Sequence, residues 1–253
     1  MERRDDSGHI TLAVSVLSTV MDLSPIFTTT MNQAGTNRSQ LNKGRPMHIV
    51  DGVLSTEVVV AGAVIAVGGI ALGLRQVSIE NMPRIALLSA VFFVASLIHV
   101  PIGPTSIHLI MNGLLGLILG WAAVPAVFIA LLLQAVFFGF GGITVLGVNT
   151  VNMALPAIVV WLIFGPILAR TEGRTMMIAA FLAGSSSIML SAIMVGLSLA
   201  LSGQEFVATA RLVFVTNIPI MVVEGFLTAA AFGLIKKVRP ALLLSGPNTS
   251  LAA

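Results

Sequence analysis

Seven apolar runs dominate the chain from residue 54 onwards and limit what it can fold into. A membrane-spanning helix needs about 20 mainly apolar residues, and five of the runs fall within or above that range. Only 9% of the residues are charged, whereas a soluble domain carries about 25%. The sequence therefore predicts an all-α polytopic membrane protein with about seven transmembrane helices, two of them short. The seven runs occupy residues 54–74, 85–100, 107–121, 123–140, 150–168, 176–201 and 212–235.

Two of the connections between these runs are unusual. The third and fourth runs are separated only by Ala122–Pro125, so they could form a tight helical hairpin. The second and third are separated by Val100-Pro-Ile-Gly-Pro104, where proline removes a backbone donor and glycine loosens the chain. Irregular backbone at membrane depth persists only where it is buried in protein or lines a cavity. The break at Val100–Pro104 therefore points to a binding site.

The distribution of positive charge predicts the topology. With Met47 outside the cell, seven of the eight lysines and arginines after it fall on the cytoplasmic side, in agreement with the positive-inside rule. We therefore expect a multi-pass protein of the inner (plasma) membrane, surrounded by lipid, with its C-terminus in the cytoplasm. A net charge of +3 is no sign of nucleic-acid binding here, because the basic residues flank apolar runs and the chain has no tyrosine.

The first 46 residues differ in composition from the remainder. They hold five of the thirteen basic residues and four of the ten acidic ones, and their short apolar piece ends at Asp22. All five basic residues would lie outside the cell, against the positive-inside rule. We expect a membrane domain at 47–240, a C-terminal tail at 241–253, and an N-terminal extension at 1–46. The extension is an artefact of an upstream start codon, a processed leader or a real segment.

The four histidines are the first candidates for metal ligands. His9 lies in the extension and is discounted, whereas His48 and His108 are assigned to a metal. Thr105 and Ser106 could cap a helix that contains His108. Asn112 would then lie one turn further along the same face and could orient that histidine. His99 is expected to end the second helix as a hydrogen-bonded residue, a residue supporting a ligand, or an alternative ligand.

The segment Met47–Gly52, with the sequence Met-His-Ile-Val-Asp-Gly, has metal-binding chemistry if Met47 is a free N-terminus. A free α-amine, the amide nitrogen of the second residue and that residue's imidazole can bind one ion together. Tetragonal nitrogen sites favour Ni(II) or Cu(II), and His108 would supply a fourth nitrogen. As numbered, Met47 is internal and lacks the amine. Asp51 either turns the chain back towards the helices or braces His48.

A carboxylate lies deep inside the seventh apolar run. Glu224 belongs to the seventh run, and an ionisable residue within the membrane is a functional candidate by default. With Asn217 and Pro219 upstream, it could equally be a packing and hydrogen-bonding centre. Asn149 and Asn152 are expected to be polar caps at the start of the fifth helix.

Several functions are excluded by missing motifs. The chain has no cysteine, and so no thiolate metal site, disulfide or cysteine nucleophile. It has neither the H-E-x-x-H motif of zinc proteases nor the phosphate loop of nucleotide hydrolases. Energy for uphill transport would therefore have to come from other subunits.

Taken together, the motifs resemble the CbiM/NikM family, the substrate-capture subunits of energy-coupling-factor transporters for cobalt and nickel. The resemblance covers about residues 47–240. It rests on Met47–Gly52, Val100–His108, Asn112–Gly116, Phe140–Gly142 and Gly147–Pro156.

The resemblance implies seven membrane helices and a free N-terminus that dips into the bundle from outside. It implies that the ligands are the Met47 amine, the amide and imidazole of His48, and His108. It also implies a transported Co(II) or Ni(II) ion with no prosthetic group. The implied partners are a transmembrane coupling subunit, a pair of cytoplasmic ATPases and often a small accessory membrane subunit. In this account the chain is not an enzyme. A stand-alone metal permease and a membrane metalloenzyme are the alternatives.

Overall fold

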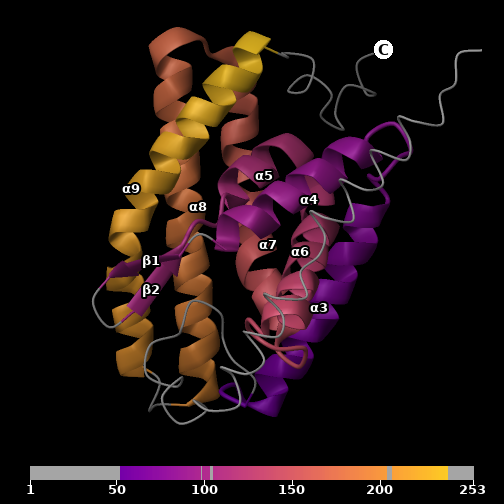
Figure 1. The fold of residues 1–253 in the computed structure, drawn as a ribbon, viewed down its shortest axis with the longest axis vertical. Coiled ribbons are helices and arrows are strands. Elements are labelled where there is room, and N and C mark those ends of the chain that lie inside the picture. Colours follow the sequence, from indigo (N-terminus) through magenta and orange to yellow (C-terminus); the bar gives the residue numbers. More distant parts are fainter. Residues whose placement is uncertain (1–51, 98, 103–104, 204–206, 239–253) are drawn as a thin grey trace, which may run out of the picture. The chain divides into compact units, whose positions relative to one another are not determined.

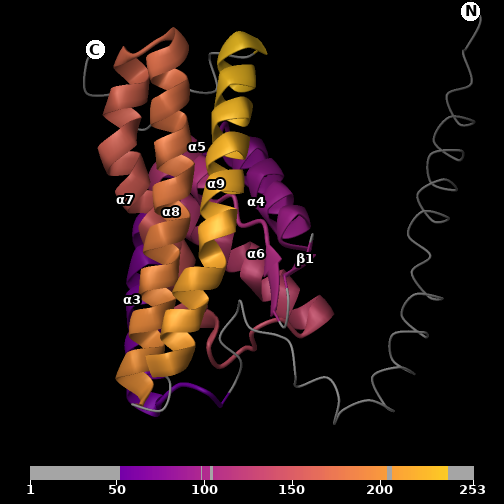
Figure 2. The ribbon, with the colours of Figure 1, turned by 90° about the vertical axis from the view of Figure 1, so that its left-hand side faces the viewer.

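The computed structural model describes residues 52–97, 99–102, 105–203 and 207–238, all within one compact unit, Arg45–Ala253 (Figure 1). The elements follow the apolar runs, and α8 and α9 lie side by side along much of their length (Figures 1 and 2). In chain order they are α3 (Thr56–Leu74), α4 (Met82–Leu97), β1 (His99–Ile102), β2 (Thr105–His108), α5 (Asn112–Leu119), the 3-10 turn η1 (Gly120–Ala122), α6 (Ala123–Phe138), α7 (Leu146–Arg170), α8 (Gly173–Ser202) and α9 (Val207–Val238).

Five segments of the described chain are long and apolar enough to cross a membrane. The protein is therefore a polytopic helical membrane protein. Each of the seven apolar runs overlaps one α-helix, but the expected seven spanning helices are not confirmed. The helices α5 and α6 count with η1 as one segment, Asn112–Phe138, and α4 is a shorter apolar helix of 16 residues.

The fold is helical, as expected, except between α4 and α5, where β1 and β2 pair as an antiparallel hairpin. The sequence predicts helices that continue to residue 100 and restart at 107. A residue that precedes proline is biased away from helical backbone, which affects Val100, and Pro101 has no N–H to donate. These restrictions suit an extended strand, and the chain forms one from His99.

The interruption expected at Ala122–Pro125 lies instead at Gly120. This residue has φ 55° and ψ −128°, a conformation open to glycine but strained for other residues. Pro125 does not break the chain, because it is the third residue of α6. The first four N–H groups of a helix have no intrahelical partner, so a proline there costs no hydrogen bond.

The segment formed by α5 and α6 lies at the centre of the unit, and α3 lies at its edge. In the hydrophobic window of α5–α6, 78% of the residues are buried, against 17% for α3. Glycines allow the helices to approach closely. A Cβ at Gly116 would lie 2.2 Å from the carbonyl oxygen of Ala157 in α7, and one at Gly62 of α3 would lie 2.4 Å from a Val148 methyl group. The absence of a side chain at these glycines therefore lets α5 and α3 pack closely against α7.

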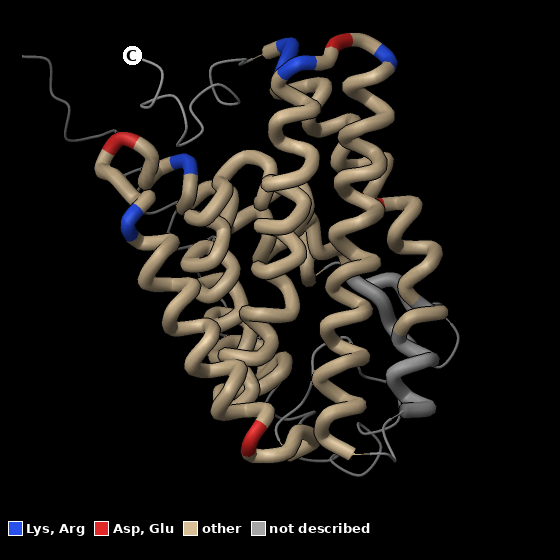
Figure 3. The backbone as a smooth tube through the Cα atoms, turned by 180° about the vertical axis from the view of Figure 1, so that it is seen from behind, with Lys and Arg blue, Asp and Glu red and all other residues tan. Residues whose placement is uncertain are grey.

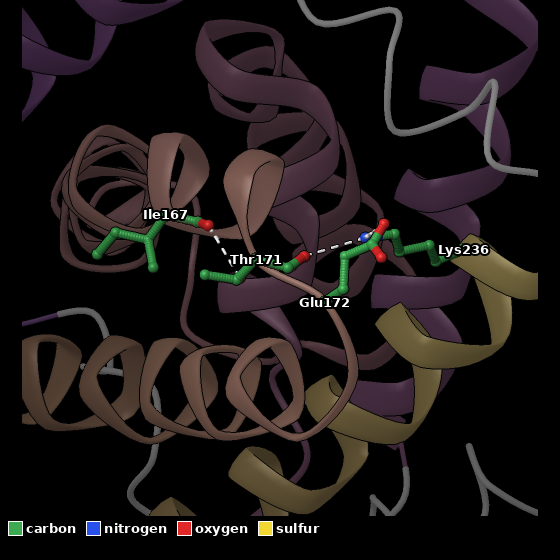
Figure 4. A network of polar contacts seen from close by, with 4 residues as sticks. All are labelled: Ile167, Thr171, Glu172 and Lys236. Carbon is green, nitrogen blue, oxygen red and sulfur yellow. Dashed lines mark hydrogen bonds and ion pairs between the residues drawn. The ribbon is translucent and has the colours of Figure 1, made fainter.

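Six lysine and arginine residues gather at one end of the helices (Figure 3). They follow α3, begin α4 and α8, and end α7 and α9: Arg75, Arg84, Arg170, Arg174, Lys236 and Lys237. At this end Lys236 Nζ donates a hydrogen bond of 3.1 Å to the carbonyl oxygen of Thr171 and lies 3.7 Å from Glu172 Oε1 (Figure 4). These contacts tie the end of α9 to the connection between α7 and α8.

Candidate metal site

The hairpin brings two histidine positions together. His99 and His108 are partners in the register of β1 and β2, as are Val100 and Ile107. Directly opposite residues in an antiparallel pair have Cα atoms about 4.5–5.5 Å apart. His99 therefore does not end a helix, and His108 does not begin one. The prolines and glycine of Val100–Pro104 correctly predicted a break between the helices. The pairing of two strands across that break was not predicted.

Other residues near His108 also lie in secondary-structure elements different from those expected. Thr105 and Ser106 belong to β2 and cannot cap a helix. The N-cap position of α5 is Met111, which makes no side-chain capping hydrogen bond. Asn112 is the first residue of α5 and so does not share a helical face with His108. Met47, His48 and Asp51 lie outside the described residues. Within the described part, no group of three or more His, Asp or Glu side chains could hold a metal ion.

Glu224 connects α9 to the chain just after β2. Its side chain is completely buried, and Oε1 accepts hydrogen bonds from the backbone N–H groups of Ile110 and Met111, the latter at 2.8 Å. The second carboxylate oxygen, Oε2, has no hydrogen-bonding partner among the described residues. Glu224 is thus a hydrogen-bonding centre in the bundle, and it holds the residues two and three positions beyond His108.

Met111 has an unusual backbone conformation where Glu224 holds it. Its φ of 53° makes it the one non-glycine residue with positive φ among the described residues. Left-handed backbone is uncommon outside glycine, asparagine and aspartate. The turn at Met111 lets the chain leave β2 and enter α5 one residue later. Two hydrogen bonds to one carboxylate oxygen help to fix this turn.

Asn112 is held by a second buried network, which joins α5 to α7 and α8. Its Nδ2 donates to Ser191 Oγ at 2.8 Å and to the carbonyl oxygen of Met153 at 3.2 Å. Its Oδ1 accepts a hydrogen bond of 2.9 Å from Ser187 Oγ. Asn112, Ser187 and Ser191 are all buried. Asn112 is therefore an internal tie between three helices.

The serines of α8 were not identified from the sequence. Ser187, Ser191 and Ser198 recur at helical spacing, and that period is the signal that could have found them. Ser198 donates a hydrogen bond of 3.2 Å to Asn152 Oδ1 in α7. Asn149 and Asn152 are not caps, because α7 begins at Leu146 and both lie buried beyond its first residues.

A similar buried contact joins α4 to α6. Gln134 Nε2 donates to Ser96 Oγ, three residues before β1, and both residues are buried. Gln134 Oε1 has no hydrogen-bonding partner among the described residues. The chain is therefore held by polar side chains on both sides of the hairpin, at Ser96 before β1 and at Ile110–Asn112 after β2.

Comparison with known proteins identifies relatives that are named for metal transport. The model of a family described as "Cobalt uptake substrate-specific transmembrane region" (CbiM) matches residues 48–242. A Haemophilus influenzae protein whose name refers to metal transport is 40% identical over 209 residues, which cover 81% of this chain and 100% of that protein. The cobalt transport protein CbiM of Sorangium cellulosum is 33% identical over 171 residues, covering 64% of this chain and 76% of the relative.

A further relative is a fused protein. The fused nickel transport protein NikMN of Rhodobacter capsulatus is 42% identical over 115 residues, which cover 43% of this chain and 33% of the fused protein.

Two solved structures of transition metal transporters, one of them truncated, have a similar fold. The truncated one is 27% identical with a TM-score of 0.61, covering 76% of this chain and 97% of that chain. The other is 25% identical with a TM-score of 0.62, covering 82% and 100%.

Proposed function

Because the chain belongs to the CbiM family of cobalt-uptake membrane proteins, we propose that it captures Co(II) or Ni(II) outside the cell. In this role it is the substrate-binding subunit of an ATP-driven uptake transporter. The observation that carries the proposal is the family match over residues 48–242, which includes His48, the hairpin and Glu224. Relatives named for cobalt and for nickel transport both support a divalent transition metal as the substrate.

The proposed metal site has four nitrogen donors. Three come from the start of the membrane domain: the Met47 amine, and the amide and imidazole nitrogens of His48. The fourth is an imidazole nitrogen of His108. Nitrogen ligands suit Co(II), Ni(II) and Cu(II), and a tetragonal arrangement favours Ni(II). Asp51 braces His48, and His99, the register partner of His108, is the first alternative ligand.

The proposed site requires Met47 to carry a free amine. The working chain in this proposal consists of the membrane domain 47–240 and the tail 241–253, without residues 1–46. The amine must lose its proton to bind a metal, and an α-amine does so far more readily than a lysine side chain. The match to the family model from residue 48 supports this choice of start.

The proposed partners supply the energy, because the sequence contains no nucleotide-binding motif. They are a transmembrane coupling subunit, a pair of cytoplasmic ATPases and a small accessory membrane subunit. The fused NikMN protein supports the accessory subunit, since its name joins two components and this chain matches only a third of it. ATP hydrolysis takes place on the partners in this scheme.

The proposed orientation places Met47 outside the inner membrane and the C-terminus in the cytoplasm. The clustering of Arg75, Arg84, Arg170, Arg174, Lys236 and Lys237 at one end of the helices supports it (Figure 3). By the positive-inside rule, that end faces the cytoplasm. The N-terminal segment then approaches the bundle from the side where metal is captured.

Uptake of radiolabelled cobalt tests this function. Cells that express the chain together with the ATPase partners are expected to accumulate cobalt against its gradient, and cells that express the chain alone are not. A catalytically inactive ATPase pair is the control, because it allows the complex to assemble but does not hydrolyse ATP. Equal accumulation without the partners would show a stand-alone permease instead.

A further inference from the structure

Three consecutive residues just beyond β2 are fixed to three different helices. Ile110 and Met111 donate their N–H groups to Glu224 of α9, and Asn112 hydrogen-bonds to Met153 of α7 and to α8. The first of them lies only two positions after His108. A metal ligand has to be held within roughly 0.5 Å of its working geometry by surroundings that are themselves fixed. The chain after His108 has such surroundings.

Glu224 is an unusual residue to hold a turn, because burial of its ionisable side chain costs free energy. An ionisable side chain within a membrane segment is costly and is found mainly where it is paired or functional. The N–H groups at the start of a helix are usually satisfied by a nearby serine, threonine, asparagine or aspartate. Here the acceptor comes from a different helix, 113 residues away from Met111 in the sequence. Capping of α5 alone would not require a carboxylate on α9.

The helices α8 and α9 pack closely together at the level of Glu224. A Cβ added to Gly184 of α8 would lie 2.6 Å from the carbonyl oxygen of Glu224 and 2.5 Å from Thr228 Oγ1. The close contact between α8 and α9 at this level brings the carboxylate to the same region as Asn112, which is tied to Ser187 one turn of α8 further on. Movement of α9 against α8 would therefore act directly on the chain that follows His108.

We propose that Glu224 is a positioning residue for the metal site: its carboxylate fixes the end of β2 and, through it, the place of His108. The inference rests on the proposed function, in which His108 is a ligand. Glu224 does not touch the metal in this scheme. It acts through the backbone of Ile110 and Met111, so its removal allows the fourth nitrogen donor to move away from the other three.

Three substitutions separate positioning from a general role in stability. Glu224→Asp keeps the carboxylate but shortens its reach to the two N–H groups. Glu224→Gln keeps an acceptor oxygen at the original reach. Thr228→Val is the matched control, because Thr228 is buried one turn further along α9 and its Oγ1 has no hydrogen-bonding partner among the described residues.

The protein and its variants are expressed from the native gene and purified in mild detergent, so that each keeps the N-terminus it has in the cell. Co(II) binding is followed by the visible d–d absorption bands, and Co(II) release by a chase with excess chelator. Removal of a group that orients a metal ligand typically costs about 10–100-fold in metal affinity. We expect Glu224→Asp to release Co(II) faster by a factor in that range and to show altered d–d bands.

The two other variants decide what such a loss means. Positioning predicts a smaller loss for Glu224→Gln than for Glu224→Asp, and wild-type bands and release for Thr228→Val. Wild-type behaviour of Glu224→Asp, an equal loss in Thr228→Val, or an equal loss in Glu224→Gln would each overturn the inference. Absence of Co(II) binding by the wild-type protein would contradict the proposed function itself. Co(II) binding by the wild-type protein that Glu224→Asp leaves unchanged would contradict only the inference about Glu224.

Discussion

Asn112 Nδ2 donates a hydrogen bond of 2.8 Å to Ser191 Oγ, so the first residue of α5 is tied to the middle of α8. The two residues are 79 positions apart in the sequence, and both are buried. Asn112 also contacts α7 through the carbonyl oxygen of Met153. The central segment of the bundle is therefore held by one amide at the point where the chain leaves the hairpin region.

We expect Asn112→Ala to lower the free energy of unfolding by about 1–3 kcal/mol, because it removes three hydrogen bonds between buried groups. Thermal unfolding in detergent, followed by the loss of helical circular dichroism, measures the change. Ser78→Ala is the control, since Ser78 makes its hydrogen bonds in an exposed turn. Equal stability of the Asn112 variant and the wild type would show that the network contributes little.

The close packing of α5 against α7 gives a second prediction about stability. A Cβ at position 116 would lie 2.2 Å from the carbonyl oxygen of Ala157, and backbone cannot move aside as a flexible side chain can. Gly116→Ala should therefore lower the free energy of unfolding by about 3 kcal/mol, the upper end of the range that is usual for overpacking.

Gly68→Ala is the matched control for that substitution. Gly68 also lies in a helix, but a Cβ there would meet no atom within 4 Å. Alanine has a higher helix propensity than glycine, by about 0.8–1.0 kcal/mol, so this variant should be as stable as the wild type or slightly more stable. If the two variants melt at the same temperature, the contact of α5 with α7 is looser than described.

The helical part of the fold was predictable because it depends on local composition. Each apolar run overlaps a helix, since the membrane requires long apolar segments whose backbone hydrogen bonds are satisfied internally. The ends of the runs were harder to predict. Residues 98–100 continue the second apolar run with only His99 polar, yet the bias of proline on Val100 favours the strand that begins at His99.

The surroundings of the candidate site could be predicted only in part. Glu224 stood out because a carboxylate is rare in an apolar run, and it proved to be fully buried. Its contact with Ile110 and Met111 joins residues more than 100 positions apart, which no local pattern encodes. The buried hydrogen bonds of Asn112 were not foreseen for the same reason, since its partners come from α7 and α8.

The topology can be tested with single cysteines, since the chain has none of its own. Ser55 precedes α3, and Ser78 follows it at the end where the basic residues gather. We expect cysteine at position 55 to react with an impermeant thiol reagent from outside intact cells, and cysteine at position 78 to react only after the membrane is opened. Labelling of both positions from the same side would overturn the proposed orientation.

The two histidines proposed as ligands should be indispensable. His48→Ala and His108→Ala each remove one imidazole from a site of four donors, so both should abolish high-affinity binding of Co(II) and Ni(II) while the helices remain folded. Isothermal titration and circular dichroism measure the two properties. His9→Ala is the control, because His9 has no part in the proposed site. Unchanged titrations of both ligand variants would rule out the site.

The central claim is that a free amine at Met47 helps to bind the metal, and the most direct test compares N-termini. Co(II) or Ni(II) is titrated into a chain that begins at Met47, into the same chain acetylated at that amine, and into the unprocessed 253-residue chain, with each N-terminus verified by mass spectrometry. The account predicts much tighter binding by the first than by the other two, because an amide in place of the amine removes one of four donors. Equal affinity of all three would contradict it and would require a site built from side chains alone, with His99 as the first substitute.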